Sequence, residues 1–331
     1  MSLERYGSYA NYLRPKPHIY LNVIPLWLMN SNKISIFIIA LILVSSCSTT
    51  NTEDEPITIV TTTGIIGDCI AQIVDGKAEV ISIMGAGVDP HLYKASQGDI
   101  AKLSQADIIV YNGLHLEGKM AQMLENFSKT KSVFAIGDYI EKSELKKVDN
   151  TSDLVDPHVW FSPNLWLDGL GGVTKELNNQ EGLDSIMDNY QNFASKIQST
   201  QTRLQQLLDE KLDSNERILI TSHDAFEYFG DAFKFKVRGL QGISTTAEYG
   251  TKDIKDITDF IINHKIKSVF VETSVPNKNL EAVVASAQAR DYNIRIGGTL
   301  YSDALGEKNT PAGTYEGMLI SNVQTIIKGL K

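Results

Sequence analysis

The tetrapeptide Val-Asp-Pro-His occurs twice in this chain and places His91 and His158 behind the same rigid dipeptide. Proline fixes its own φ at about −65° and favours an extended conformation in the preceding residue, so each histidine follows a stiffened backbone. A stiff ligand loses little conformational entropy on binding. The two aspartates, Asp89 and Asp156, have two alternative roles: forming the turn, or accepting the second ring N–H of the histidine and so fixing its tautomer.

A third histidine, His223, is the last residue of a predicted strand. His91 follows the predicted strand 78–84 through the glycine-rich loop GAGVD, and His158 lies between a polar stretch and the sequence VWFSP. All three lie near the carboxyl ends of predicted strands or in the loops that follow, where open α/β sheets assemble ligand sites. One histidine in such a place would mean little, but three of them predict a joint site.

The last α/β unit offers a fourth ligand, because Asp303 lies in a polar, glycine-rich turn after a predicted strand. Three imidazoles and one carboxylate form a donor set that suits Mn²⁺, Zn²⁺ or Fe²⁺. A Ca²⁺ or Mg²⁺ site would consist mostly of oxygen ligands, so those ions are disfavoured. The predicted metal ligands are His91, His158, His223 and Asp303.

Roles outside the metal site are expected for two further histidines and one cysteine. His115 is expected near the site or at the surface, and His264 ends a predicted helix, where a cation is favourable. Cys69, in the apolar pattern GIIGDCIAQIV, is expected to be a small buried hydrophobe and not a reactive thiol. Trp160 and Trp166 are expected to pack the helix that follows His158 against the first lobe.

Predicted strands and helices alternate along the chain, which is typical of α/β proteins. In the first half, strands are predicted at 57–63, 78–84, 107–113 and 131–137, with helices at 64–74, 97–105 and 117–128. In the second half, strands are predicted at 216–223, 235–240, 267–273 and 293–298, with helices at 225–233, 251–265 and 277–290. The pattern predicts two α/β lobes with central, mostly parallel sheets.

The segment 182–213 separates the two halves and has the pattern of one long helix. It contains no proline, and its apolar residues recur at spacings of three and four. About 30 helical residues span about 45 Å, enough to run along both lobes. The predicted N-terminal lobe is 57–181 and the C-terminal lobe is 214–331. We expect limited closure, because a helix packed along both lobes resists hinge bending.

Residues 33–47, KISIFIIALILVSSC, have the pattern of a bacterial lipoprotein signal. The apolar run 34–44 is shorter than the roughly 20 residues of a transmembrane helix. We therefore expect cleavage before Cys47 and lipidation of that cysteine, with a membrane-spanning anchor as the alternative.

The leader is expected to comprise residues 1–46, with Met29 as the true start, and a flexible tether is expected at 47–56. The chain of 331 residues is 42% hydrophobic, which predicts a globular protein. Without the leader, which carries four basic residues and one acid, 27 basic and 39 acidic residues remain, a net charge of about −12. This charge excludes nucleic acid as an expected partner and favours a soluble exported domain.

Several motifs, in this order, resemble those of the TroA-type solute-binding lipoproteins of bacterial manganese and zinc ABC transporters: GVDPHLY, VDPHVWFSP, ITSHDAFEYFG, LQGIST, and LYSDALG with GTYEGM. The resemblance runs from about residue 57 to the C-terminus. In that family the metal lies in the cleft between two α/β lobes joined by a long helix, and the four family ligands fall on His91, His158, His223 and Asp303. The resemblance implies an exported, lipid-anchored monomer that binds a divalent metal with high affinity and delivers it to a permease and its ATPase, without catalysis.

The choice of metal depends on two departures from the zinc-specialised relatives. Those relatives usually carry a histidine-rich loop before the second histidine, whereas YIEKSELKKVDNTSDLVD has none, and LQGISTTAE is similar to the manganese-type branch. Some manganese-type members have Glu in place of His223, and a typical nitrogen and oxygen site binds Zn²⁺ more tightly than Mn²⁺. We expect Mn²⁺ first, Zn²⁺ as a close second and Fe²⁺ as a further compatible ion; zinc-specific uptake is the alternative.

Two other functions compete with metal delivery. A metallohydrolase would need three protein ligands, a metal-bound water and a general base, for which Asp303, Glu227 or Glu248 would be available. A binding protein for an organic solute or a metal chelate would need an apolar or cationic pocket in place of four converging ligands.

Overall fold

The computed structural model describes residues 56–148, 153–246 and 249–331. The predictions for the leader, for Met29, for Cys47 and for nearly all of the tether lie outside these residues. The described chain from Pro56 to Lys331 forms one compact unit. Within these ranges, no helix has the length and apolar character needed to cross a membrane.

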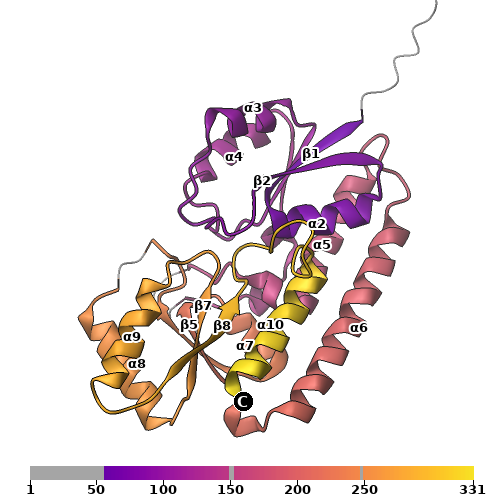
Figure 1. Cartoon of the computed structure of the whole chain (residues 1–331). Coiled ribbons are helices and arrows are strands. Elements are labelled where there is room, and N and C mark those ends of the chain that lie inside the picture. Colours follow the sequence, from indigo (N-terminus) through magenta and orange to yellow (C-terminus); the bar gives the residue numbers. More distant parts are fainter. Residues whose placement is uncertain (1–55, 149–152, 247–248) are drawn as a thin grey trace, which may run out of the picture. The chain divides into compact units, whose positions relative to one another are not determined.

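The N-terminal half forms a parallel four-stranded sheet with helices on both faces, which we call the N-lobe (Figure 1). Its strand order is β2-β1-β3-β4. The strands are β1 (Ile57–Thr63), β2 (Ala78–Met84), β3 (Ile108–Tyr111) and β4 (Ser132–Ala135). The helices are α2 (Gly64–Val74), α3 (Gln97–Gln105), α4 (Ala121–Ser128) and α5 (Pro163–Asn178), with 3₁₀ turns η2 (Ile136–Tyr139), η3 (Lys142–Glu144) and η4 (Val159–Phe161).

The C-terminal half repeats this architecture with strand order β6-β5-β7-β8, and we call it the C-lobe. Its strands are β5 (Ile218–His223), β6 (Lys236–Gln241), β7 (Ser268–Glu272) and β8 (Arg295–Leu300). Its helices are α7 (Glu227–Phe233), α8 (Thr251–Asn263), α9 (Lys278–Gln288) and α10 (Tyr315–Leu330), with a 3₁₀ turn η5 (Ser214–Glu216). The predicted fold of two parallel α/β lobes is confirmed, although α10 was not among the predicted helices.

The linking helix α6 spans Met187–Lys211 and is shorter than predicted. Gly182 and Ser185 have φ values of 81° and 64°, in the left-handed region, so a right-handed helix cannot include them. Its 25 residues span about 37 Å. It contacts α2 and α5 of the N-lobe and α10 of the C-lobe, and Figure 1 shows it running past these helices.

Helix α4 begins at Ala121 and not at Glu117, because the Glu117 side chain closes the preceding turn. Its buried carboxylate accepts hydrogen bonds from the backbone N–H of Asn112 at 2.8 Å and of Gly113 at 3.2 Å, and from the Thr62 hydroxyl at 2.7 Å. A buried carboxylate needs such donors, and Glu117 reaches them from the turn that precedes α4. The prediction of a helix from residue 117 was therefore wrong by one turn.

One hydrophobic cluster runs through both lobes. It includes Ile59 on the N-lobe sheet and Phe270 on the C-lobe sheet. Phe161 of η4 stacks on Phe226 of the C-lobe with ring centroids 4.4 Å apart. Burying one such ring contributes about 1.5–3 kcal/mol, so separating the lobes would expose aromatic surface at a large cost. Limited closure of the lobes stays a prediction, for which this shared core gives a second reason.

Candidate metal centre

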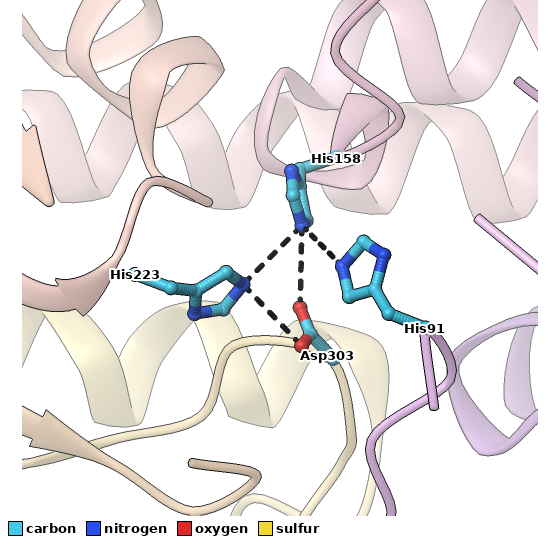
Figure 2. A group of neighbouring side chains, drawn as sticks. All are labelled: His91, His158, His223 and Asp303. Carbon is cyan, nitrogen blue, oxygen red and sulfur yellow. Dashed lines mark hydrogen bonds and ion pairs between the residues drawn. The ribbon is translucent and has the colours of Figure 1, made fainter. Parts of the chain in front are cut away.

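Four buried side chains converge at the interface of the two lobes: His91, His158, His223 and Asp303 (Figure 2). One potential ligand atom from each lies within 4.8 Å of the others. His158 Nε2 lies 3.2 Å from His91 Nε2, 3.4 Å from His223 Nε2 and 3.5 Å from Asp303 Oδ1. The other carboxylate oxygen, Oδ2, lies 3.4 Å from His223 Nε2. The structure thus brings together all four predicted ligands.

The strand ends explain how residues so distant in sequence meet. His91 lies in the loop after β2, His223 ends β5, Asp303 follows β8, and His158 precedes η4. In the C-lobe the crossover connections change direction between β5 and β7, and α/β sheets bind ligands at such switch points. The site therefore has the location that parallel topology favours.

This donor set has the properties of a cation site. Asp303 Oδ1 is buried and accepts no hydrogen bond from the described residues. A buried carboxylate oxygen without a donor is costly, and a cation would compensate it. Atoms that share an ion at about 2.2 Å lie at most about 4.4 Å apart, so a small contraction of the cluster would accommodate one.

Asp156 braces His158 in both of the ways considered for the Val-Asp-Pro-His repeats. Its Oδ1 accepts a hydrogen bond from the His158 backbone N–H at 3.0 Å and lies 2.6 Å from Nδ1 of the ring. A carboxylate at Nδ1 favours the tautomer with the proton on that nitrogen, which leaves Nε2 free to bind a metal.

Asp89 has only one of these two roles. Its Oδ1 accepts from the His91 backbone N–H at 2.9 Å, which forms the turn. Its other oxygen accepts from the Thr245 hydroxyl at 2.6 Å, on the C-lobe, and does not contact the His91 ring. For Asp89, the alternative that it fixes the tautomer of His91 is wrong.

Glu272 is the residue that sequence reasoning missed. It ends β7, is 2% exposed, and accepts from the His223 backbone N–H at 2.9 Å. Its Oε2 lies 2.5 Å from His223 Nδ1. The sequence pattern that could have indicated this role is an acidic residue at the end of the apolar strand SVFVE. A carboxylate in that position is buried and needs a partner.

Gly239 on β6 permits the close approach of its strand to the end of β5. A Cβ at this position would lie 2.5 Å from the Asp224 backbone nitrogen and 2.6 Å from the His223 carbonyl carbon. These distances are far below van der Waals contact, so any side chain here would displace the backbone that carries His223. The glycine thus helps to position a candidate ligand.

The charged groups of the site shift one another's pKa values. Burial lowers the pKa of His91 to about 3. Burial also lowers the pKa of His223, but the negative charges of Glu272 and Asp303 outweigh it and hold the pKa well above 6.5. Burial raises the pKa of Asp303, yet the neighbouring histidines, His223 first, bring it below its usual value. The metal-free site therefore favours an Asp303 carboxylate beside a protonated His223.

The contacts of Trp160 and Trp166 differ partly from the predicted packing against the first lobe. Trp166 donates a hydrogen bond to Cys69 Sγ in the N-lobe, and its ring also lies 6.2 Å from the ring of Tyr315 in α10. Cys69 is buried, as predicted. Trp160 instead donates to the backbone carbonyl of Ser302 in the C-lobe at 3.0 Å. A buried indole N–H needs an acceptor, and for Trp160 this acceptor is a carbonyl of the opposite lobe.

The remaining candidates lie apart from the cluster. His115 is exposed, in a left-handed turn, and His264 caps α8 with its ring stacked on Phe260. Glu227 lies 3.6 Å from the Lys146 ammonium group, with which it forms an ion pair. Glu248 lies outside the described residues.

Replacing Glu272 with glutamine is expected to lower metal affinity about ten- to hundredfold, because partners of metal-bound histidines typically contribute this much. The amide keeps the acceptor for the His223 backbone but removes the charge beside Nδ1. Competition with a chromogenic chelator measures the affinity. Glu281→Gln, at an exposed position of α9, is the matched control, and equal affinities for both variants would contradict the assigned role.

Comparisons with known proteins agree with this geometry. The manganese-binding lipoprotein MntA of Bacillus subtilis (strain 168) is 41% identical over 280 residues, covering 84% of this chain and 91% of MntA. The zinc-binding protein TroA of Treponema pallidum (strain Nichols) is 38% identical over 278 residues, covering 82% of this chain and 88% of TroA. The solved structure of periplasmic zinc-binding TroA from Treponema pallidum has a TM-score of 0.79 at 37% identity, covering 82% of this chain and 98% of that one. Residues 59–329 match the family described as zinc-uptake complex component A, periplasmic, and the chain belongs to this family.

Proposed function

We propose that this protein captures a divalent transition-metal ion outside the cytoplasm and delivers it to an ABC permease driven by a separate ATPase. The ion is the transported substrate, and its ligands are His91, His158, His223 and Asp303. The observation that carries the proposal is the convergence of three imidazole nitrogens and a carboxylate in one buried cluster. Relatives described as manganese-binding and zinc-binding proteins support it.

Mn²⁺ is the first proposed substrate and Zn²⁺ a close second, with Fe²⁺ also compatible. Both oxygens of Asp303 face the histidine cluster, so three nitrogens and a bidentate carboxylate can supply five donor atoms. Zinc in structural sites is almost always four-coordinate, whereas a fifth donor atom and carboxylate oxygens suit manganese. The three nitrogens keep Zn²⁺ competitive, and zinc-specific uptake is the alternative function.

We propose that residues 1–46 are removed, that Cys47 carries a lipid, and that the segment 47–56 tethers a monomeric binding domain. The relatives described as lipoproteins support this anchoring. Four protein donors in one buried cluster also support capture over hydrolysis, since a catalytic zinc site keeps a position for water.

Thermal unfolding with added ions tests the proposal. Protein stripped of metal should gain about 2.7 kcal/mol of stability from an ion at a hundred times its Kd. For a protein of this size the gain corresponds to a rise in Tm of about 5 °C. Mn²⁺, Zn²⁺ and Fe²⁺ are compared with Mg²⁺ as the control. The absence of a shift with all three transition metals would refute the metal site.

A further inference from the structure

The segment that carries His158 is tied firmly to the C-lobe. Three hydrogen bonds made by buried side chains cross from one lobe to the other: Trp160 Nε1 to Ser302 O at 3.0 Å, Tyr315 Oη to Trp160 O at 2.7 Å, and Tyr228 Oη to Asp156 O at 3.2 Å. The stacked rings of Phe161 and Phe226 lie beside them. As a result, His158 keeps its position relative to His223 and Asp303 although it belongs to the N-lobe.

The loop that carries His91 has no comparable support. The rings of His158 and His223 each have a carboxylate beside Nδ1, whereas Nδ1 of His91 has no partner among the described residues. The neighbouring Leu92 is 50% exposed. His91 is therefore the least constrained of the three histidines.

A single side-chain hydrogen bond joins this loop to the described part of the C-lobe. The Thr245 hydroxyl donates to Asp89 Oδ2 at 2.6 Å. The other oxygen of the same carboxylate accepts from the His91 backbone N–H at 2.9 Å. One carboxylate thus connects the backbone of a candidate ligand to the opposite lobe.

We propose that the hydrogen bond between Asp89 and Thr245 is a latch that holds His91 against the metal and sets the rate at which the ion leaves. Asp89 is then a positioning residue for His91. Because the lobes share a hydrophobic core, the exit route is displacement of the loop 85–93 and not separation of the lobes. The inference rests on the proposed metal-binding function and adds to it a control over release.

Thr245→Val tests the latch, because valine has nearly the shape of threonine but lacks the hydroxyl donor. Thr245→Ser, which keeps the hydroxyl, is the matched control. The ion is loaded as Zn²⁺ and, separately, as Mn²⁺, and its release into excess chelator is followed by stopped flow. The valine variant should release the ion about tenfold faster, as expected for loss of a hydrogen bond to a charged group. The serine variant should stay within about twofold of the parent protein.

The thermal stability of the metal-free variants separates the latch from a general loss of structure. Thr245 is partly exposed in a loop, so the variants should fold, and metal-free Tm values provide the check. Thr245→Ala removes the same hydroxyl and serves as a second variant. Release at the parental rate in both the valine and the alanine variants would overturn the latch, as would equally fast release from the serine variant. A parent protein that binds neither ion would instead refute the proposed function itself.

Discussion

Replacing Asp303 with alanine is expected to weaken the binding of Mn²⁺ and Zn²⁺ by about a thousandfold, or about 4 kcal/mol. Asp303 supplies the only anionic ligand of the cluster, and both of its oxygens face the histidines. Its removal leaves a divalent ion among neutral ligands in a buried site, where an uncompensated charge is costly. The effect should exceed that of removing any single residue that only braces a ligand.

Competition with chelators of graded affinity measures this loss. Asp303→Asn keeps one oxygen ligand without the charge and should lie between the parent protein and the alanine variant. Asp259→Ala is the control, because Asp259 forms exposed ion pairs with Lys255 and Arg290 far from the cluster. Unchanged affinity in the Asp303→Ala protein would contradict the ligand assignment. Retained metal combined with loss of a hydrolytic activity would support the metallohydrolase alternative.

Lowering the pH is expected to weaken metal binding, because His223 has a raised pKa and must lose a proton to bind an ion. The negative charges of Glu272 and Asp303 raise the pKa of His223 and so favour a protonated ring in the metal-free protein, and an ion must displace that proton. Displacing one proton costs a factor of about ten per pH unit below that pKa. His91, whose pKa is lowered to about 3, and Asp303, whose pKa is also lowered, do not take up protons near neutral pH.

Calorimetry in two buffers of different ionisation enthalpy measures the proton count directly. Metal binding should release a proton at any pH below the raised pKa of His223. Binding that is independent of pH and releases no proton would show that His223 is neutral in the metal-free protein. The same pKa shift has a second consequence: protonated His223 stabilises the metal-free fold below about pH 6.5, and this contribution is lost as the pH rises through the folded pKa.

The architecture was largely predictable because it depends on local patterns. Apolar strands and amphipathic helices alternate, and that alternation leaves parallel sheets as the natural packing. Two helix boundaries were predicted wrongly, one because of a tertiary contact and one because of the local backbone conformation. Helix α4 begins late because Glu117 is needed to cap a turn, and α6 begins late because Gly182 and Ser185 adopt left-handed conformations.

The sequence by itself determined which residue types could bind a metal. It also placed His91, His223 and Asp303 at or after strand ends, because these positions depend on local periodicity and on proline and glycine. Only the tertiary structure decided which groups support them. Two identical Asp-Pro-His segments have different surroundings: Asp156 braces the ring of its own histidine, whereas Asp89 reaches Thr245 in the other lobe. Glu272 meets His223 across 49 residues because β5 and β7 are neighbours in the sheet. Such partners depend on strand order and on the packing of the lobes, which no short stretch of sequence encodes.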